Sequence, residues 1–424
     1  MLFANIDILD ENLDHKRGMF VGIEGSHVTY VGAEEPADTA RFGERYDGTG
    51  KLLMSAFYNT HAHTPMTLLR GYAENQPLQQ WLNDTVWPFE GKMDMEKKHH
   101  YWGCMLSQAE MLRYGVVGYT DMYFATIDRC EATLEAGMKA NHCDGDTLPV
   151  AAVNEQLFAE YQNAGDGRVK IDMCVHGEYT TPQGMIERCV AEAKAHDTGL
   201  HIHLAETKLE CDECKERHDG MTPAAWFDYL GAFDIPVTAA HCVWVEPSDI
   251  ELMAAKGVNV SLNPASNMKL ASGFAPVQAM IDAGVHCSIG TDGMASNNTH
   301  NILQSAYLLA CAQKGNALDP AIITPKEILR MLTVNGARSQ RRHDCGVLAQ
   351  GKRADLIVMD IDTPWMTPVH DIATNLVYSA NGADVVLTMC DGQVLYRDGE
   401  YETIDVEKAK AEVKRSVDEV LVAL

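Results

Sequence analysis

Two histidines, His61 and His63, follow an apolar run at residues 52–57 that is short enough to be a buried strand. Because side chains alternate along a strand, both imidazoles point to the same side, where they can share one cation. Further imidazoles and carboxylates stand at the ends of other apolar segments, namely His176, Glu178, His203, Glu206, His241 and Asp292. One His-x-His pair occurs often by chance, but this convergence predicts a metal site.

The elements that position these residues alternate between short apolar segments and longer amphipathic ones. With the strand that ends at His61, the predicted strands number eight, the others being 116–120, 150–153, 169–175, 200–204, 237–240, 258–262 and 285–289. Helices are predicted between them, for example at 96–114 and 182–196. Eight strand–helix units favour an α/β fold with a (β/α)8 TIM barrel at residues 56–344, whose polar strand ends meet at one face.

The two ends of the chain differ from this middle. Short strands are predicted near both termini, at 2–9, 19–23, 27–31, 355–359, 385–389 and 393–396. Asp391-Gly392 is typical of a hairpin turn. We therefore expect a small β-sandwich domain formed by residues 1–55 and 345–424, with a C-terminal helix. Thr324-Pro325 predicts the start of the helix that ends the barrel.

Composition limits the classes of partner. The chain has 424 residues and a net charge of −26, from 34 Lys and Arg against 60 Asp and Glu, so its surface repels nucleic acid and anionic membranes. No apolar run of 18 residues and no leader at Met1 are present, so a cytoplasmic protein is expected. Twelve scattered cysteines fit a reducing compartment. Cys211 and Cys214 are expected on a solvated helix face.

Several stretches resemble the amidohydrolase superfamily, and within it the branch of methylthioadenosine/S-adenosylhomocysteine deaminases and related adenosine-type deaminases. They lie at 59–63 (Asn-Thr-His-Ala-His), 66–71, 201–207 (His-Ile-His-Leu-Ala-Glu-Thr), 241–243, 263–270 and 290–298. The resemblance covers the full chain, including the split β domain. It implies that one divalent metal is bound by His61, His63, His203 and Asp292. Zinc is the usual ion, and iron or manganese also suits these ligands.

The residue types favour one metal ion over two. Binuclear members bridge their ions with a carboxylated lysine at the end of the fourth strand, where this chain has His176. Lys170 lies six residues earlier, roughly 20 Å away along a strand. It cannot reach the site. Three imidazoles and one carboxylate leave room for a catalytic water.

The resemblance implies an aminohydrolase that cleaves a cyclic amidine C–N bond, such as C6–N6 of adenosine, to give the inosine analogue and ammonia. A bound metal would lower the pKa of its water. Glu206 is the expected proton donor to the ring nitrogen, and Asp292 would pass the proton of water to ammonia. His241 would orient the nucleophile and stabilise charge on the tetrahedral intermediate.

Substrate contacts are also implied by the resemblance. Glu90 would hold ribose hydroxyls and His176 would contact the substrate, whereas Trp87 either lines the base pocket or packs. Arg168 is the available partner for the carboxylate of S-adenosylhomocysteine, but residues 154–167 contain no arginine. Small or neutral 5′ groups are therefore favoured, as in 5′-methylthioadenosine, 5′-deoxyadenosine and adenosine.

Two other classes of function remain open. The first is a hydrolase of the same superfamily that acts on a guanine, pterin or halogenated triazine ring, for which an altered Glu90 loop is expected. The second is an inactive scaffold, which the complete ligand set disfavours. A homodimer or homotetramer is compatible with the sequence.

Overall fold

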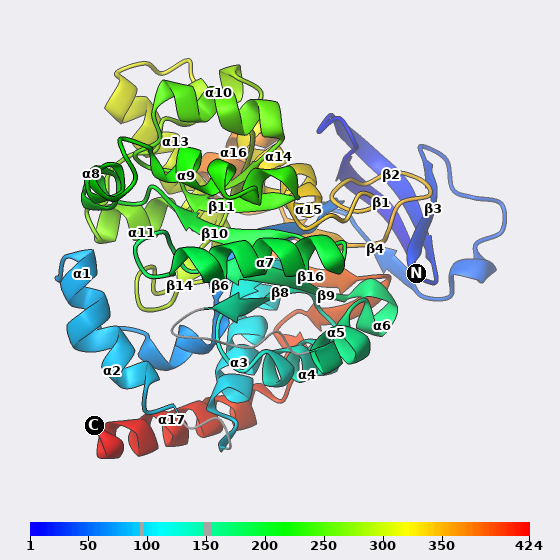
Figure 1. The fold of residues 1–424 in the computed structure, drawn as a ribbon. Coiled ribbons are helices and arrows are strands. Elements are labelled where there is room, and N and C mark those ends of the chain that lie inside the picture. Colours follow the sequence, from blue (N-terminus) through cyan, green and yellow to red (C-terminus); the bar gives the residue numbers. More distant parts are fainter. Residues whose placement is uncertain (94–96, 147–154) are drawn as a thin grey trace.

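The computed structural model describes residues 1–93, 97–146 and 155–424. One of its two nine-stranded sheets is parallel, with the strand order β13-β12-β11-β10-β9-β8-β7-β6-β14 (Figure 1). The strands are β6 (Phe57–His63), β7 (Val116–Met122), β8 (Lys139–Asp146), β9 (Val169–Val175), β10 (Leu200–Leu204), β11 (Val237–His241), β12 (Asn259–Leu262), β13 (His286–Ile289) and β14 (Asp292–Gly293). Only Gly290 and Thr291 separate β13 from β14, so the two ends of the sheet are neighbours in sequence and the sheet curls back towards itself.

Most of the predicted strands are confirmed, with two departures. The strand predicted at 150–153 lies outside the described residues, and the strand between β7 and β9 is β8, which is rich in polar side chains. The apolar run 52–57 is divided between two sheets. Its first part is β5 (Lys51–Ser55) of the other sheet, and only β6 carries His61 and His63.

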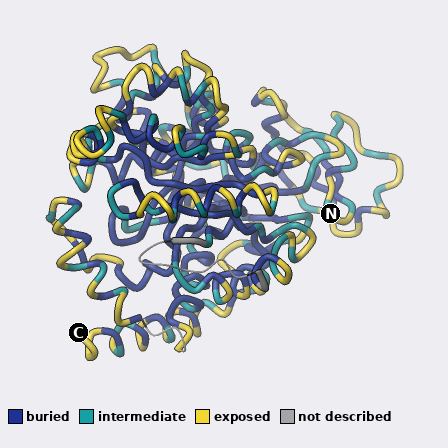
Figure 2. Tube along the Cα trace, in the orientation of Figure 1, coloured by how far each residue is buried: buried dark blue, intermediate teal, exposed yellow. Residues whose placement is uncertain are grey.

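Helices cover the outside of the curled sheet (Figure 1). They are α3 (His99–Arg113), α4 (Thr126–Ala136), α5 (Glu155–Tyr161), α6 (Ala164–Gly167), α7 (Gln183–Ala195), α8 (Lys208–Arg217), α9 (Pro223–Tyr229), α10 (Pro247–Lys256), α11 (Pro264–Lys269), α12 (Val277–Asp282), α13 (Ile302–Ala317), α14 (Pro325–Leu332) and α15 (Val334–Ser339). Figure 2 shows that the strands are buried and that buried and exposed residues alternate along the longer helices around them, as expected of helices with one face on a core. The short α6 has no buried residue. The helices predicted at 96–114 and 182–196 correspond to α3 and α7. As predicted, α14 starts at Thr324, which forms a capping box with Glu327.

The second sheet combines both ends of the chain. Its order is β18-β17-β16-β15-β5-β1-β2-β3, with β4 paired to β1. Its strands are β1 (Leu2–Leu9), β2 (His15–Glu24), β3 (His27–Gly32), β4 (Arg45–Asp47), β5, β15 (Leu356–Asp360), β16 (Val385–Cys390), β17 (Gln393–Arg397) and β18 (Glu400–Tyr401). The predicted hairpin turn at Asp391-Gly392 joins β16 to β17.

Two C-terminal helices pack on the helices of the parallel sheet rather than on the terminal strands. α16 (Ile372–Tyr378) contacts α14, and α17 (Val406–Ala423) lies along α3 at the lower edge of the molecule in Figure 1. In the part of the chain that the structure describes, no helix is long and apolar enough to cross a membrane.

A buried ion-pair network joins the two sheets. The ammonium of Lys139 on β8 lies 2.5 Å from Asp355 Oδ2 and 2.7 Å from Asp391 Oδ1. Tyr58 on β6 donates its hydroxyl to Asp355 at 2.6 Å. Although burial alone would raise the pKa of Asp355, Lys139 lowers it to about 2. The polar residue that starts β8 is therefore paired, which allows it to be buried.

Candidate functional site

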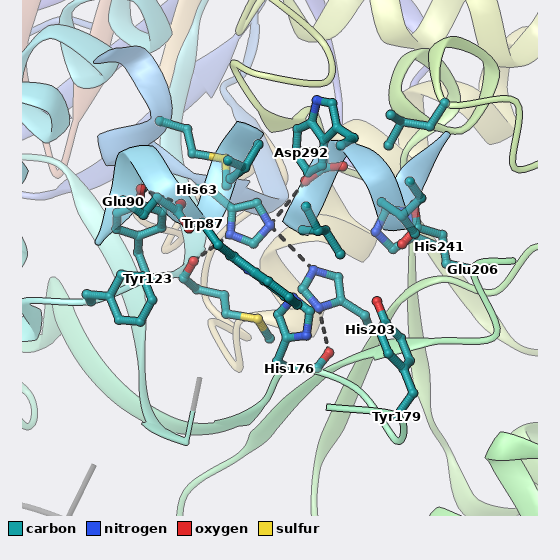
Figure 3. A pocket seen from close by; sticks show the side chains of 18 residues that line it. His63, Trp87, Glu90, Tyr123, His176, Tyr179, His203, Glu206, His241 and Asp292 are labelled. Carbon is teal, nitrogen blue, oxygen red and sulfur yellow. Dashed lines mark hydrogen bonds and ion pairs between the residues drawn. The ribbon is translucent and has the colours of Figure 1, made fainter. Parts of the chain in front are cut away.

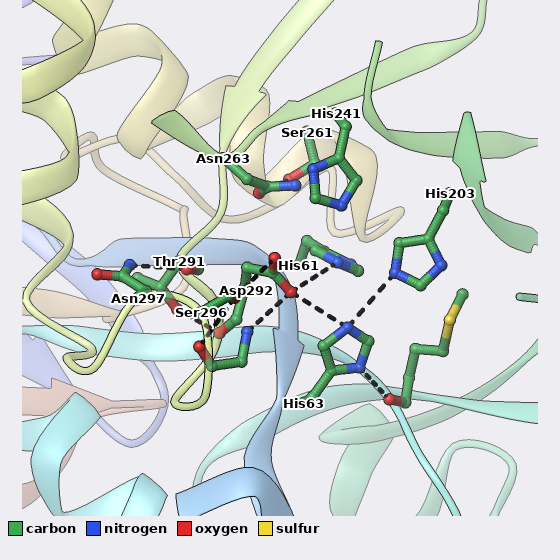
Figure 4. A network of polar contacts seen from close by, with 12 residues as sticks. His61, His63, His203, His241, Ser261, Asn263, Thr291, Asp292, Ser296 and Asn297 are labelled. Carbon is green, nitrogen blue, oxygen red and sulfur yellow. Dashed lines mark hydrogen bonds and ion pairs between the residues drawn. The ribbon is translucent and has the colours of Figure 1, made fainter. Parts of the chain in front are cut away.

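The four predicted metal ligands converge at the ends of three strands (Figure 4). His61 and His63 come from β6, His203 from β10 and Asp292 from β14. Asp292 Oδ1 lies 3.3 Å from His61 Nε2 and 3.2 Å from His63 Nε2, and His203 Nε2 lies 3.4 Å from His63 Nε2. All four side chains are buried. The parallel sheet thus brings residues about 230 positions apart into one cluster, as the strand-end argument predicted.

The hydrogen bonds of the imidazoles fit a metal ion at their centre. His63 Nδ1 donates to the carbonyl of Met122 at 2.5 Å, and His203 Nδ1 donates to the carbonyl of His176 at 2.6 Å. Each Nε2 therefore keeps a lone pair for a cation. His61 Nε2 is buried and makes no hydrogen bond to the described residues. Burial lowers the pKa of His61 to about 4, so its imidazole is neutral, as a ligand must be.

Glu206 and His241 lie beside this cluster. Glu206 stands between β10 and α8, and His241 ends β11 with its Nδ1 3.8 Å from Glu206 Oε1. Asn267 Oδ1 lies 2.8 Å from the same Nδ1 and orients the ring. Burial raises the pKa of Glu206, which shifts its carboxyl towards the protonated form relative to an exposed glutamate.

A further carboxylate, Glu210, was not singled out in the sequence. Its side chain accepts the backbone N–H groups of Ala205 and Glu206 at 2.9 and 2.8 Å, so it holds the loop that carries Glu206. Thr207 caps α8 by accepting from the N–H of Glu210. The Thr-x-x-Glu spacing is typical of a helix N-terminus, and this signal could have drawn attention to Glu210.

A cavity of about 670 Å³ opens next to the cluster (Figure 3). Much of its wall comes from the segment 78–90, which forms α1 (Leu78–Gln80), a π-helical turn (Trp81–Val86) and α2 (Trp87–Glu90). The apolar lining consists of Met66, Leu78, Trp81, Leu82, Val86, Met122, Phe124 and Leu270. In Figure 3, Glu90 and Tyr123 lie on one side of the cavity and Glu206 and His241 on the other. An apolar space with few polar groups at its ends suits a small organic ligand.

Three of the four predicted substrate residues line this cavity. Glu90 accepts a hydrogen bond from the Tyr123 hydroxyl at 2.6 Å, and burial raises the pKa of Glu90 to about 7. His176 lies within 2.8 Å of Thr180 Oγ1 through its Nδ1, and its ring centroid is 6.4 Å from that of Trp87. Tyr123 and Tyr179 complete the polar lining and were missed, because lone tyrosines after strands carry no distinctive spacing.

Arg168 is not brought to the site. It directly precedes β9, at the opposite end of the strand from His176, and its Nε lies 3.3 Å from Asp391 Oδ2 of the terminal sheet. Eight residues of extended chain correspond to roughly 26 Å. The predicted solvated face for Cys211 and Cys214 is also wrong, because both lie on α8 but are buried.

Comparisons with known proteins cover nearly the whole chain. Residues 52–395 match the model of the amidohydrolase family. The chain is 38% identical over 381 residues to a 5-methylthioadenosine/S-adenosylhomocysteine deaminase of Dictyoglomus thermophilum, covering 88% of this chain and 89% of that protein. It is 38% identical over 367 residues to a 5′-deoxyadenosine deaminase of Methanothermobacter thermautotrophicus, covering 85% of each. The crystal structure of an adenosine deaminase from Xanthomonas campestris with bound zinc superposes with a TM-score of 0.92 at 28% identity, covering 99% of this chain and 98% of that one.

Proposed function

The chain belongs to the amidohydrolase family, and from this premise we propose that it hydrolytically deaminates adenosine-type nucleosides to the inosine analogue and ammonia. The observation that carries the proposal is the arrangement of one cavity. Three of the four potential ligands, His63, His203 and Asp292, line it, with Glu206 on one side and Glu90 on the other (Figure 3). The relatives named as deaminases of 5′-substituted adenosines support the same activity.

We also propose the finer architecture. The curled sheet at residues 56–344 is a (β/α)8 barrel in which β13 and β14 are two parts of the eighth strand. The pairing of β13 with β12 and of β14 with β6 supports this, because both flanks of one continuous segment are then paired. Residues 1–55 and 345–424 form the smaller domain, in which the terminal sheet folds as a β sandwich.

His61, His63, His203 and Asp292 would hold one divalent metal ion, for which we propose zinc. The zinc bound to the Xanthomonas enzyme supports this choice, and iron or manganese would suit the same ligands. Lys170 donates to the carbonyl of Arg341 at 2.7 Å, far from these ligands along β9, which supports one ion and not two. When bound, the metal supplies a water activated for attack near neutral pH.

Side chains of the protein then donate and accept the protons that the reaction requires. Glu206 donates its proton to the purine ring nitrogen, which makes the neighbouring carbon electrophilic, and it regains a proton from the added hydroxyl group when the carbonyl of the product forms. Asp292 accepts a proton from the attacking water and delivers it to the departing ammonia. His241, held by Asn267, stabilises the negative charge that develops at the reacting carbon's oxygen.

Glu90 and His176 are proposed to bind the sugar, and Trp87 to border the base. Tyr123 occupies one carboxylate oxygen of Glu90, while Oε2 makes no hydrogen bond to the described residues and can accept from a ribose hydroxyl. The cavity lining contains no Lys or Arg, and neither does the sequence of 94–96 or 147–154. A substrate with a neutral 5′ group therefore fits better than one with a free carboxylate.

Steady-state kinetics on a panel of substrates tests the proposal. Ammonia release is measured with adenosine, 5′-deoxyadenosine, 5′-methylthioadenosine, S-adenosylhomocysteine, adenine and guanine. We expect kcat/KM for the first three to equal or exceed that for S-adenosylhomocysteine, and to exceed that for adenine by roughly a hundredfold. Turnover of free bases at the rate of nucleosides would overturn the assignment.

A further inference from the structure

We propose that His201 is a positioning residue that holds the imidazole of His61 in the tautomer that binds a metal through Nε2. This inference rests on the proposed metal site and adds a residue outside its ligand set. His201 lies on β10 and is only 1% exposed, and its Nε2 is 2.8 Å from His61 Nδ1. The two rings are stacked, with centroids 5.0 Å apart and planes at 20°.

His61 differs from the other two proposed imidazole ligands in the kind of partner it has. His63 and His203 donate to backbone carbonyls, which can only accept a hydrogen bond and therefore determine the tautomer. The partner of His61 is a side chain, and a neutral imidazole nitrogen can either donate or accept. The tautomer of His61 consequently depends on where His201 carries its proton.

A hydrogen bond between His61 Nδ1 and His201 Nε2 contains one proton, which leaves two arrangements. If the proton is on His61, then His61 Nε2 has a free lone pair and faces Asp292, 3.3 Å away. If the proton is on His201, a neutral His61 carries its own proton on Nε2 and cannot bind a cation there. In the first arrangement Nε2 of His201 accepts the hydrogen bond, so a neutral His201 must carry its own proton on Nδ1.

The surroundings of His201 favour that first arrangement. His201 Nδ1 is buried and has no hydrogen-bond partner among the described residues. The residue also lines a small cavity whose polar side chains include Thr120, Asp172, Thr238 and Asn259. A buried site with carboxylate and hydroxyl oxygens can hold a water that accepts a hydrogen bond from the Nδ1–H of His201. With Nδ1–H bonded to such a water, Nε2 of His201 is the nitrogen left to accept from His61.

The test compares zinc affinity in three full-length variants. His201→Gln keeps an acceptor at the position of Nε2, whereas His201→Met has a similar size and offers no comparable acceptor. His286→Met is the matched control, because it makes the same change at the first residue of β13, at the end of the parallel sheet away from the proposed ligands. Dissociation constants are measured by competition with a chromophoric chelator, and the melting temperature of each metal-free protein is recorded.

We expect His201→Met to weaken zinc binding by about 10- to 100-fold, the scale for loss of a residue that orients a metal ligand. His201→Gln and His286→Met should bind zinc within about threefold of the parent, with metal-free melting temperatures close to the parent's. Equal zinc affinity of the Met and Gln variants would overturn the role of His201. A parent protein that binds no divalent metal would instead overturn the proposed metal site.

The comparison remains decisive if the Met variant does not fold. His201→Asn then replaces it, because Asn keeps the amide but is too short to place its oxygen beside His61 Nδ1. The expected order of zinc affinity is the same, with Gln above Asn, and an Asn variant that binds as tightly as the Gln variant contradicts the proposal.

Discussion

Replacement of Glu90 by Gln tests the side of the cavity that would hold the sugar. The carboxylate is half-buried, and one of its oxygens is occupied by Tyr123 at 2.6 Å. A hydrogen bond to a charged group contributes about 1.5–3 kcal/mol, which corresponds to roughly 10- to 150-fold in a rate or equilibrium constant. Gln keeps the volume and loses the charge. We therefore expect kcat/KM for adenosine to fall by at least about tenfold.

The assay measures ammonia release from adenosine and from adenine, with the parent and the variant in one buffer. Adenine has no ribose, so its kcat/KM should be unchanged by Glu90→Gln. The matched control is Asp84→Asn, which makes the same carboxylate-to-amide change at an exposed position of the same segment. An equal loss for adenosine and adenine, or no loss for adenosine, would refute the sugar contact.

The pH dependence of the same reaction gives a second readout. Burial raises the pKa of Glu90 to about 7, and the hydrogen bond from Tyr123 only partly opposes this shift. The carboxylate is the stronger acceptor, so kcat/KM for adenosine should rise from about pH 6 to about pH 8 as Glu90 loses its proton. Glu90→Gln should remove this step, and adenine should not show it in the parent.

Three further outcomes are expected. Glu206→Gln should lower activity by at least about a hundredfold, the scale of a general acid, with metal content unchanged; loss of the metal would show that Glu206 is a ligand. Elemental analysis should find one divalent ion per chain, and a chelator should abolish an activity that zinc restores; two ions per chain would contradict this. Lys139→Met should lower the free energy of unfolding by about 3–5 kcal/mol, because Asp355 stays buried without its cation, whereas the exposed Lys410→Met should change it little in the same urea titration. In the parent, the depressed pKa of Asp355 makes its contribution complete above about pH 4 and lost as pH falls to about 2.

The cluster of proposed ligands could be predicted because it depends on two simple regularities. Alternation along β6 puts His61 and His63 on one face. The curl of the parallel sheet brings the end of β10, which is not a neighbour of β6 in the strand order, across to the end of β6. Neither regularity requires knowledge of any single contact. The tautomers of His63 and His203, in contrast, depend on hydrogen bonds to the carbonyls of Met122 and His176. The positions of these carbonyls depend on the local backbone conformation, which the pattern of residue types does not specify.

The strand β8 could not be predicted from hydrophobic periodicity. Its residues include Lys139, Asn141 and His142, and all three are buried. Each is paired with a group on another element: Lys139 with Asp355, 216 residues later, Asn141 with Asp172, and His142 with Arg129 and Thr133 of α4. Burial of such side chains is favourable only when the partners are in place, so the information resides in pairs of residues and not in the local pattern.

Strand direction explains the error at Arg168 and bears on substrate choice. The spacing that excludes Lys170 from the metal site applies equally to Arg168, since both lie at the start of β9 while the chemistry lies at its end. With Arg168 paired to Asp391 instead, a carboxylate on a substrate tail would enter a cavity that already contains Glu90 and Glu206 and whose lining includes no Lys or Arg. Desolvation of that charge without a counter-ion costs free energy that a methylthio or methyl group does not. The position of one arginine along a strand thus favours neutral 5′-substituted adenosines over S-adenosylhomocysteine.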